Sequence, residues 1–294
     1  MTRYEPAIDV DALTAIDVHV HIEVDHQGHS SLPDDLRDAA AKYFSTDGPN
    51  PDLDGVAGYY RDRRMAAVVF TVDAETNLGQ SPLSSAAIAE GAARNNDVLI
   101  PFGSVDPLKP TAVDDARRLI EDHGVRGFKF HPTVQGFDPS DAAHSRLYET
   151  LQEAGVVALF HTGQTGIGAG LPGGRGLLLG LSNPMLLDPV AARFPELQII
   201  MAHPSVPWQD EALSVATHKH NTWIDLSGWS PKYFPEQLVR AANSYLKSRV
   251  LFGSDFPLLT PDRWLRDVEQ TSLKPDVMPG ILKANAARLL GLAR

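Results

Sequence analysis

The chain has 294 residues, of which 43% are hydrophobic and 21% are charged, a composition typical of a soluble globular protein with a large core. Its formal net charge of −11 argues against nucleic acid or an anionic membrane as a partner, because both require clustered lysine and arginine. The absence of cysteine excludes disulfides, thiol nucleophiles and thiolate metal sites, so any metal ion must be held by histidine and carboxylates.

The N-terminal segment is charged rather than apolar. Residues 1–11 include Arg3, Glu5, Asp9 and Asp11, so they lack the apolar core of a signal peptide. No apolar run elsewhere approaches the roughly 18 residues that cross a bilayer. We therefore expect a cytoplasmic enzyme that acts on a small molecule.

Short runs rich in Val, Ile and Phe recur along the chain and alternate with amphipathic helical stretches. Eight such runs predict parallel βαβ units that close into a single-domain (β/α)8 TIM barrel over residues 1–294. An open doubly wound sheet is the alternative, but the glycine-rich phosphate turn expected of it does not follow the first strand. The expected strands cover 15–21, 66–73, 98–106, 125–132, 156–163, 198–205, 222–228 and 250–257, and the expected helices 84–95, 111–122, 141–154, 184–194, 208–218 and 235–246.

The first predicted strand carries two imidazoles. Because side chains alternate between the faces of a strand, Asp17, His19 and His21 are expected on one face and the intervening apolar residues on the other. Two neutral imidazole nitrogens side by side suit a borderline metal such as zinc. The alternative is a pair of hydrogen-bonded core histidines, since an unpaired buried polar ring costs about 1 to 3 kcal/mol.

Two segments interrupt the alternation of strands and helices. Residues 23–55 follow the first strand and contain prolines, aspartates and one expected short helix; we interpret them as an inserted lid, the alternative being a loose surface loop. Residues 163–180 are glycine-rich and are expected to form a substrate wall. The final segment, 284–294, is expected to be a helix that covers one end of the barrel.

Polar residues end four of the later strands. They are Lys129 and His131 on the fourth, His161 on the fifth, His203 on the sixth and Asp255 on the eighth. The carboxyl ends of barrel strands converge on one mouth, so these side chains and the two histidines of the first strand should meet in space. This arrangement predicts a metal site, whereas a single histidine would more often be structural.

These residues resemble the amidohydrolase superfamily, in the amidohydrolase-related branch that contains aminocarboxymuconate semialdehyde decarboxylase. The resemblance covers the whole chain and identifies the superfamily, but it does not identify the substrate. It rests on Asp17-x-His19-x-His21, His161, His203, Gly253-Ser254-Asp255 and the helix Asn285-Ala286-Ala287-Arg288-Leu289-Leu290.

The resemblance implies a ligand set. His19, His21, His161 and Asp255 would bind one divalent metal ion, with zinc expected and manganese or another divalent ion as alternatives. A metal ion held by imidazoles lowers the pKa of its water toward about 7. Asp255 would then accept a proton from that water and pass it to the leaving group, and His203 would orient or protonate the substrate oxygen.

Further residues are expected to contact substrate. Lys129 would hold a substrate carboxylate or carbonyl as a free ammonium; the alternative is a carbamylated lysine that bridges two metal ions. His131 could bind substrate in the same way. The alternative for both residues is that they form only hydrogen bonds within the rim of the barrel. Arg175 is a candidate anion clamp or a solvated loop residue. Trp208 and Trp229 are candidate aromatic walls or ordinary packing residues.

The pattern leaves two reactions open. The favoured one is hydrolysis, in which metal-activated water attacks an ester, lactone, amide or C–C bond of a β-keto or aromatic-catabolic substrate. The alternative is non-oxidative decarboxylation of an aromatic or unsaturated acid; some such enzymes carry Glu-x-His where this chain has His19-x-His21, although the aminocarboxymuconate type shares His-x-His. A non-catalytic barrel is a third possibility. Branch members often pair, so a homodimer is possible.

Overall fold

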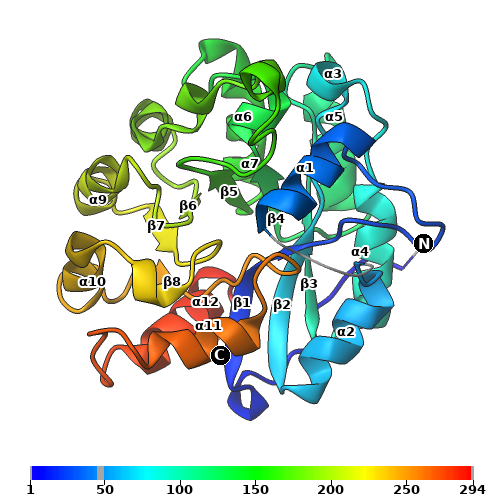
Figure 1. Cartoon of the computed structure of the whole chain (residues 1–294). Coiled ribbons are helices and arrows are strands. Elements are labelled where there is room, and N and C mark those ends of the chain that lie inside the picture. The colour runs from blue at the N-terminus through cyan, green and yellow to red at the C-terminus, as the bar shows by residue number, and fades with distance from the viewer. Residues whose placement is uncertain (1, 45–49, 293–294) are drawn as a thin grey trace.

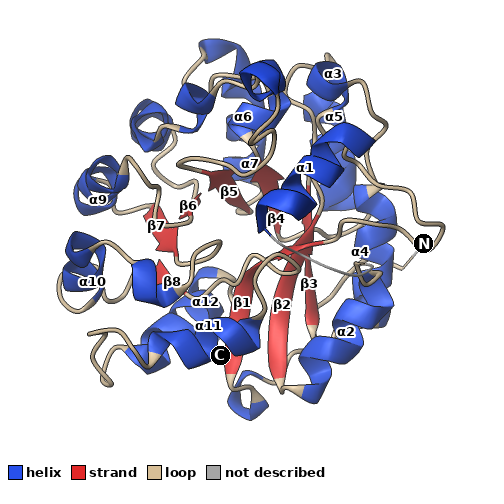
Figure 2. Cartoon of the chain, viewed as in Figure 1, coloured by secondary structure: helices blue, strands red, loops and turns tan. Residues whose placement is uncertain are grey.

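The computed structural model describes residues 2–44 and 50–292. Eight strands lie side by side in chain order and every neighbouring pair is parallel, with helices outside them (Figures 1 and 2). The strands are β1 (Ala15–His21), β2 (Met65–Phe70), β3 (Leu99–Gly103), β4 (Gly127–Phe130), β5 (Val157–His161), β6 (Ile199–Ala202), β7 (Thr222–Asp225) and β8 (Val250–Leu251).

The helices follow the strands along the chain. They are α1 (Asp34–Phe44), α2 (Leu53–Asp62), α3 (Glu75–Leu78), α4 (Ser85–Arg94), α5 (Ala112–Glu121), α6 (Pro132–Gln135), α7 (Ser145–Glu153), α8 (Asp188–Arg193), α9 (Gln209–His218), α10 (Glu236–Ala242), α11 (Pro261–Val268) and α12 (Asn285–Leu289). None of the described helices combines the length and the apolar composition that a bilayer crossing requires.

The last strand returns to the first and closes the sheet. Val18 N–H donates to the Phe252 carbonyl at 3.0 Å, Asp255 N–H to the His19 carbonyl at 2.9 Å, and His21 N–H to the Phe256 carbonyl at 2.8 Å. The (β/α)8 prediction is therefore confirmed, and the open-sheet alternative is wrong.

Alternate side chains of the strands point into the barrel or out toward the helices. The inner set forms a separate buried cluster that includes Ile16, Val68, Phe102, Leu159 and Ile200. Ala286, Ala287 and Leu290, on or just after α12, join the same cluster, as expected for a helix that covers one end of the barrel. That helix is shorter than predicted: a π-helical turn (Gly280–Ala284) precedes it, and residues 293–294 lie outside the described residues.

A β-bulge in β1 corrects the predicted face of Asp17. The pairing of β1 with β2 shifts by one residue between Asp17 and Val20, so the strict alternation assumed from the sequence is interrupted. Val18 belongs to the inner cluster, whereas Asp17 accepts a hydrogen bond from the Tyr60 hydroxyl of the surrounding helix α2 at 2.7 Å. Asp17 therefore does not share a face with the two histidines.

The segment after β1 contains more helix than predicted. It includes all of α1 and the first turn of α2, while residues 45–49 of the predicted lid lie outside the described residues. Leu36 of α1 packs in a small buried cluster with Leu78 and Val134. Tyr43 and Phe44, at the end of α1, meet edge to face with ring centroids 4.9 Å apart.

Candidate active site

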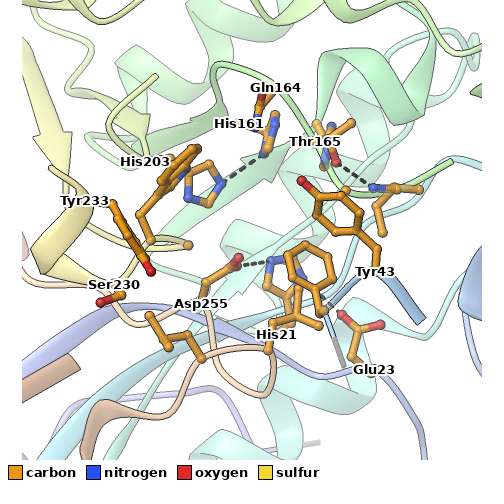
Figure 3. A pocket seen from close by; sticks show the side chains of 18 of the residues that line it. His21, Glu23, Tyr43, His161, Gln164, Thr165, His203, Ser230, Tyr233 and Asp255 are labelled. Carbon is orange, nitrogen blue, oxygen red and sulfur yellow. Dashed lines mark hydrogen bonds and ion pairs between the residues drawn. The ribbon is translucent and has the colours of Figure 1, made fainter. Parts of the chain in front are cut away.

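A pocket of about 330 Å³ opens at the carboxyl ends of the strands. Six of the predicted site residues line it, and Figure 3 shows His21, His161, His203 and Asp255 turned toward a common space. His19 and Lys129 are fully buried behind them: His19 contacts the lining residue His21, and Lys129 contacts His19. The predicted lining residues are His21, His131, His161, His203, Trp229 and Asp255.

Three donor atoms from the first strand and the turn after the last strand form a small triangle. His19 Nε2 lies 3.2 Å from His21 Nε2, and each of these nitrogens lies 3.3 Å from Asp255 Oδ1. Ligands about 2.0 to 2.1 Å from a tetrahedral ion are separated by roughly 3.3 to 3.4 Å. The triangle therefore has the dimensions of one face of a tetrahedral site.

Carboxylates orient both histidines of β1. His19 Nδ1 donates to Asp225 Oδ2 at 2.9 Å, which leaves the lone pair on Nε2 directed at the triangle. His21 Nδ1 lies 3.4 Å from Glu23 Oε1. Fixing the Nδ1 side of a metal-binding imidazole in this way sets its tautomer and ring orientation.

Three further histidines lie beside the triangle. His203 Nε2 is 3.0 Å from His161 Nδ1, and the His131 ring stacks on His161 with centroids 3.8 Å apart and an interplanar angle of 9°. His161 Nε2 is buried and has no hydrogen-bond partner among the described residues. Donor atoms of His19, His203 and Asp255 lie within 4.8 Å of one another, so the two groups of residues share one site.

The amine of Lys129 bonds the nitrogen of His19 that faces the triangle. Lys129 Nζ lies 2.9 Å from His19 Nε2 and 5.0 Å from the centroid of the Phe70 ring. Burial lowers the pKa of Lys129 to about 8. Because a neutral imidazole has one lone pair, Lys129 can bond Nε2 only while no cation occupies that lone pair.

Burial and neighbouring charges set the protonation of the site. Burial alone would raise the pKa of Asp255, but its contacts with His21 and His19 hold that pKa below the ordinary value. Burial, with the nearby Lys129, lowers the pKa of His19 to about 3, and burial also lowers the pKa of His203. A carboxylate and neutral imidazoles are the forms that bind metal cations.

Unusual backbone geometry places two of the reactive side chains. His203 and Asp255 have φ values of 69° and 73°, a left-handed conformation that costs a non-glycine residue about 1 to 3 kcal/mol and is concentrated at functional sites. Gly253 passes so close to the site that an added Cβ would lie 3.0 Å from His19 Cβ. The turn that contains Gly253 and Asp255 ends β8 early, after Leu251, and carries Asp255 to the triangle.

Two predicted substrate contacts lie elsewhere. The Arg175 guanidinium is bound to Asp35 of α1, with Nε 2.7 Å from Oδ2, and it does not line the pocket in the described part of the chain. It therefore joins the glycine-rich loop to α1 instead of clamping an anion. Trp208 directly precedes α9 and likewise is not among the described lining residues, whereas Trp229 is.

Several site residues were not predicted from the sequence. Asp225 and Ser227 follow the strand-end rule that identified the other residues, and the same rule applied to the seventh strand would have found them. The others come from loops and helices and carry no such signal. The additional residues are Glu23, Tyr43, Phe44, Asp225, Ser227, Tyr233 and Arg263.

Comparison with known proteins places the chain in a family. The amidohydrolase family model matches residues 16–292. Among curated proteins, none matches the sequence significantly.

Several solved structures share the fold at low sequence identity. A TIM-barrel protein from Bordetella bronchiseptica has a TM-score of 0.76 and 22% identity, covering 94% of this chain and 98% of its own. A dihydroxybenzoic acid decarboxylase from Polaromonas sp. JS666, with bound manganese and 2-nitroresorcinol, has a TM-score of 0.66, 16% identity and coverage of 96% and 98%. A probable 2-pyrone-4,6-dicarboxylic acid hydrolase from Acinetobacter baumannii, with citric acid bound, has a TM-score of 0.61, 15% identity and coverage of 95% and 100%.

The resemblance inferred from the strand-end residues is thus confirmed at the level of the superfamily. The matched region contains the barrel from the second residue of β1 onward and every histidine and aspartate of the pocket. The similar folds include both a decarboxylase and a probable hydrolase. The chain itself belongs to the amidohydrolase family.

Proposed function

We propose that this amidohydrolase-superfamily enzyme is a metal-dependent hydrolase that uses activated water to attack the carbonyl carbon of an ester, lactone, amide or ketone. The observation that carries the proposal is the triangle of His19 Nε2, His21 Nε2 and Asp255 Oδ1, whose edges are 3.2 to 3.3 Å. An ionised carboxylate beside paired imidazoles supports both metal binding and proton transfer.

The donor set fits a divalent ion. Imidazole and carboxylate ligands without thiolates suit zinc or manganese. His161 Nε2 is buried without a hydrogen-bond partner among the described residues, which supports a bound ion as its partner, since buried polar atoms are rarely left unpaired. We propose His19, His21, His161 and Asp255 as ligands of one such ion, with zinc as the expected metal. When bound, the ion would polarise the substrate carbonyl oxygen and lower the pKa of water.

The side chains around this site divide the remaining tasks. Asp255, whose pKa is held low, can accept a proton from the attacking water and deliver it to the leaving group. His203 lines the pocket beside Asp255 and is proposed as a second proton-transfer residue. The Lys129 amine, 2.9 Å from His19 Nε2, is proposed to hold a substrate oxygen once it no longer bonds that nitrogen.

The pocket lining supports a planar carbonyl or carboxylate substrate, such as a compound from aromatic or β-keto acid breakdown. Tyr43, Phe44, Trp229 and Tyr233 provide aromatic walls, which suit a flat conjugated molecule. Arg263 lines the same pocket and its guanidinium can pair with a carboxylate. His131 is proposed as a further substrate contact, because it borders the pocket while stacked on His161.

Decarboxylation is the second candidate. It is supported by the structural likeness to a dihydroxybenzoic acid decarboxylase with bound manganese. In that reaction carbon dioxide leaves and an acid must protonate the carbon that it leaves behind, whereas hydrolysis adds water across the bond.

Reaction in oxygen-18 water separates the two. Candidate lactones, esters and β-keto compounds are incubated with the metal-loaded enzyme, and the products are examined by mass spectrometry. Hydrolysis predicts one oxygen-18 atom in a product carboxyl group. Release of carbon dioxide from a carboxylic acid, with no label in the other product, would contradict the hydrolase proposal and favour the lyase.

A further inference from the structure

We propose that Ser227, in the loop directly after β7, is a positioning residue that fixes the tautomer of His203, so that this histidine presents an unprotonated Nε2 to the pocket. The proposal deepens the proposed function, on which it rests for its catalytic meaning. It makes His203 a base in the resting enzyme, whereas the resemblance implied that His203 would orient or protonate the substrate oxygen.

Asp225 is fully buried and accepts four hydrogen bonds. Its Oδ1 accepts hydrogen bonds from the main-chain N–H groups of His203 at 3.2 Å and Ser227 at 2.9 Å and from the Ser227 hydroxyl, and its Oδ2 accepts from His19 Nδ1 at 2.9 Å. An ionised carboxylate can only accept hydrogen bonds. The Ser227 hydroxyl hydrogen must therefore point at Asp225.

The same hydroxyl oxygen also contacts His203. Ser227 Oγ lies 2.9 Å from His203 Nδ1 and 3.0 Å from His19 Nδ1, whose hydrogen is shared with Asp225 Oδ2. A hydroxyl has one hydrogen, and here it is directed at Asp225, so the oxygen can only accept a bond from His203. His203 Nδ1 must then carry the hydrogen, and in the neutral ring the lone pair is on Nε2.

The imidazole of His203 is held in this orientation by the backbone around it. Gly228, the residue after Ser227, has a φ of +73°, and a Cβ added there would lie 2.6 Å from His203 Nδ1. His203 itself has a left-handed φ of 69°. The ring therefore keeps Nδ1 against Ser227 and Nε2 toward the pocket, 3.0 Å from His161 Nδ1.

This tautomer has a direct chemical consequence. An imidazole in solution prefers its hydrogen on Nε2, so Ser227 imposes the less favoured form on His203. The lone pair at Nε2 accepts the hydrogen of His161 Nδ1 in this structure. When that bond is given up, it can accept a proton from water or a substrate hydroxyl, but it cannot donate one until it has been protonated. The arrangement suits hydrolysis better than a decarboxylation whose first need is an acid.

Nitrogen NMR of histidine-labelled protein loaded with zinc, which is diamagnetic, tests the proposal directly. The shifts and ring couplings of His203, assigned by comparison with His203→Gln, report which nitrogen carries the hydrogen. The wild-type protein is expected to show His203 with hydrogen on Nδ1. Hydrogen on Nε2 in the wild type would overturn the proposal without any need for a serine variant.

A matched pair of serine variants then tests the cause. Ser227→Ala is expected to shift the His203 hydrogen to Nε2 and lower kcat about 10- to 100-fold with little change in KM. Ser205→Ala is the control, because this fully buried hydroxyl bonds Thr162 at 2.7 Å and lies near the His203 carbonyl but not its ring; it should leave the tautomer unchanged.

These results separate the proposal from the proposed function. A Ser227→Ala protein that folds and retains hydrogen on His203 Nδ1 would refute the role of Ser227, whatever the reaction proves to be. A switch of tautomer in an enzyme that fails the oxygen-18 experiment would support the role of Ser227 and refute hydrolysis.

Discussion

At the scale of single residues, His161 and His203 lie 3.0 Å apart but are assigned different roles. If His161 binds the metal ion, His161→Ala should weaken metal binding by more than the roughly 10- to 100-fold that loss of an outer partner causes. If His203 only moves protons, His203→Ala should keep the metal and lower kcat by about 100- to 10,000-fold. Elemental analysis after dialysis, together with kcat, distinguishes the two.

His144→Ala is a suitable control for both variants. His144 is buried, but its ring contacts Phe137 at a centroid distance of 5.0 Å and it does not line the described pocket. It should alter neither metal content nor kcat. If His161→Ala and His203→Ala both retain full metal and activity, the assignment of roles is wrong.

The sequence predicts which side chains at the strand ends meet in the site, but it predicts the positions of loop side chains less well. His21, His161, His203 and Asp255 were placed together because the carboxyl ends of barrel strands converge. The position of Arg175, expected to be an anion clamp or a solvated loop residue, could not be predicted, because a loop residue has no register; its glycine-rich loop carries it to Asp35 of α1. Arg263, from the first turn of α11, borders the pocket instead.

At the scale of elements, α1 borders the pocket by packing its last two residues on the loop after β5. A Cβ added at Gly166 would lie 2.4 Å from Phe44 and 2.8 Å from Tyr43. Gly166→Ala should therefore push this aromatic pair away and raise KM about 10-fold, equivalent to roughly 1.4 kcal/mol of lost binding. Metal content and kcat should change little.

Gly180→Ala controls for this prediction within the same region. A Cβ at Gly180 would meet nothing within 4 Å, so its KM should match that of the wild type. An unchanged KM in Gly166→Ala would show that Tyr43 and Phe44 do not contact the substrate.

Element boundaries were predicted less well than element order. The predicted eighth strand ran to residue 257, whereas β8 ends at Leu251, because the following residues turn to bring Asp255 to the site with a φ of 73°. The bulge in β1 likewise separates Asp17 from His19. Neither feature changes the apolar pattern from which strands are recognised, so neither could be inferred from it.

At the scale of the whole molecule, Asp17 helps to close the barrel. It accepts hydrogen bonds from Ser254 N–H at 2.9 Å and from the Tyr60 hydroxyl at 2.7 Å, and so connects β1, α2 and the chain after β8. Tyr60 is fully buried. Tyr60→Phe should lower the free energy of unfolding by about 1 to 3 kcal/mol, because it removes one partner of a buried carboxyl group.

Tyr59→Phe provides the comparison in a denaturant titration. The Tyr59 hydroxyl bonds Asp262 at 2.9 Å at an exposed site, so its loss should change stability by less than about 0.5 kcal/mol. Equal losses in the free energy of unfolding for the two variants would show that the hydrogen bond between Tyr60 and Asp17 stabilises the closed barrel no more than an exposed hydrogen bond does.

The proposed metal site joins distant parts of the whole molecule, because groups from β1, β5 and the turn after β8 are proposed to bind a single divalent ion. Elemental analysis of the purified wild-type protein and of a His19→Ala, His21→Ala double variant tests it most directly. We expect about one equivalent of zinc or a similar ion per wild-type chain and almost none in the variant. A wild-type protein that hydrolyses its substrate at full rate with no bound metal would contradict the account.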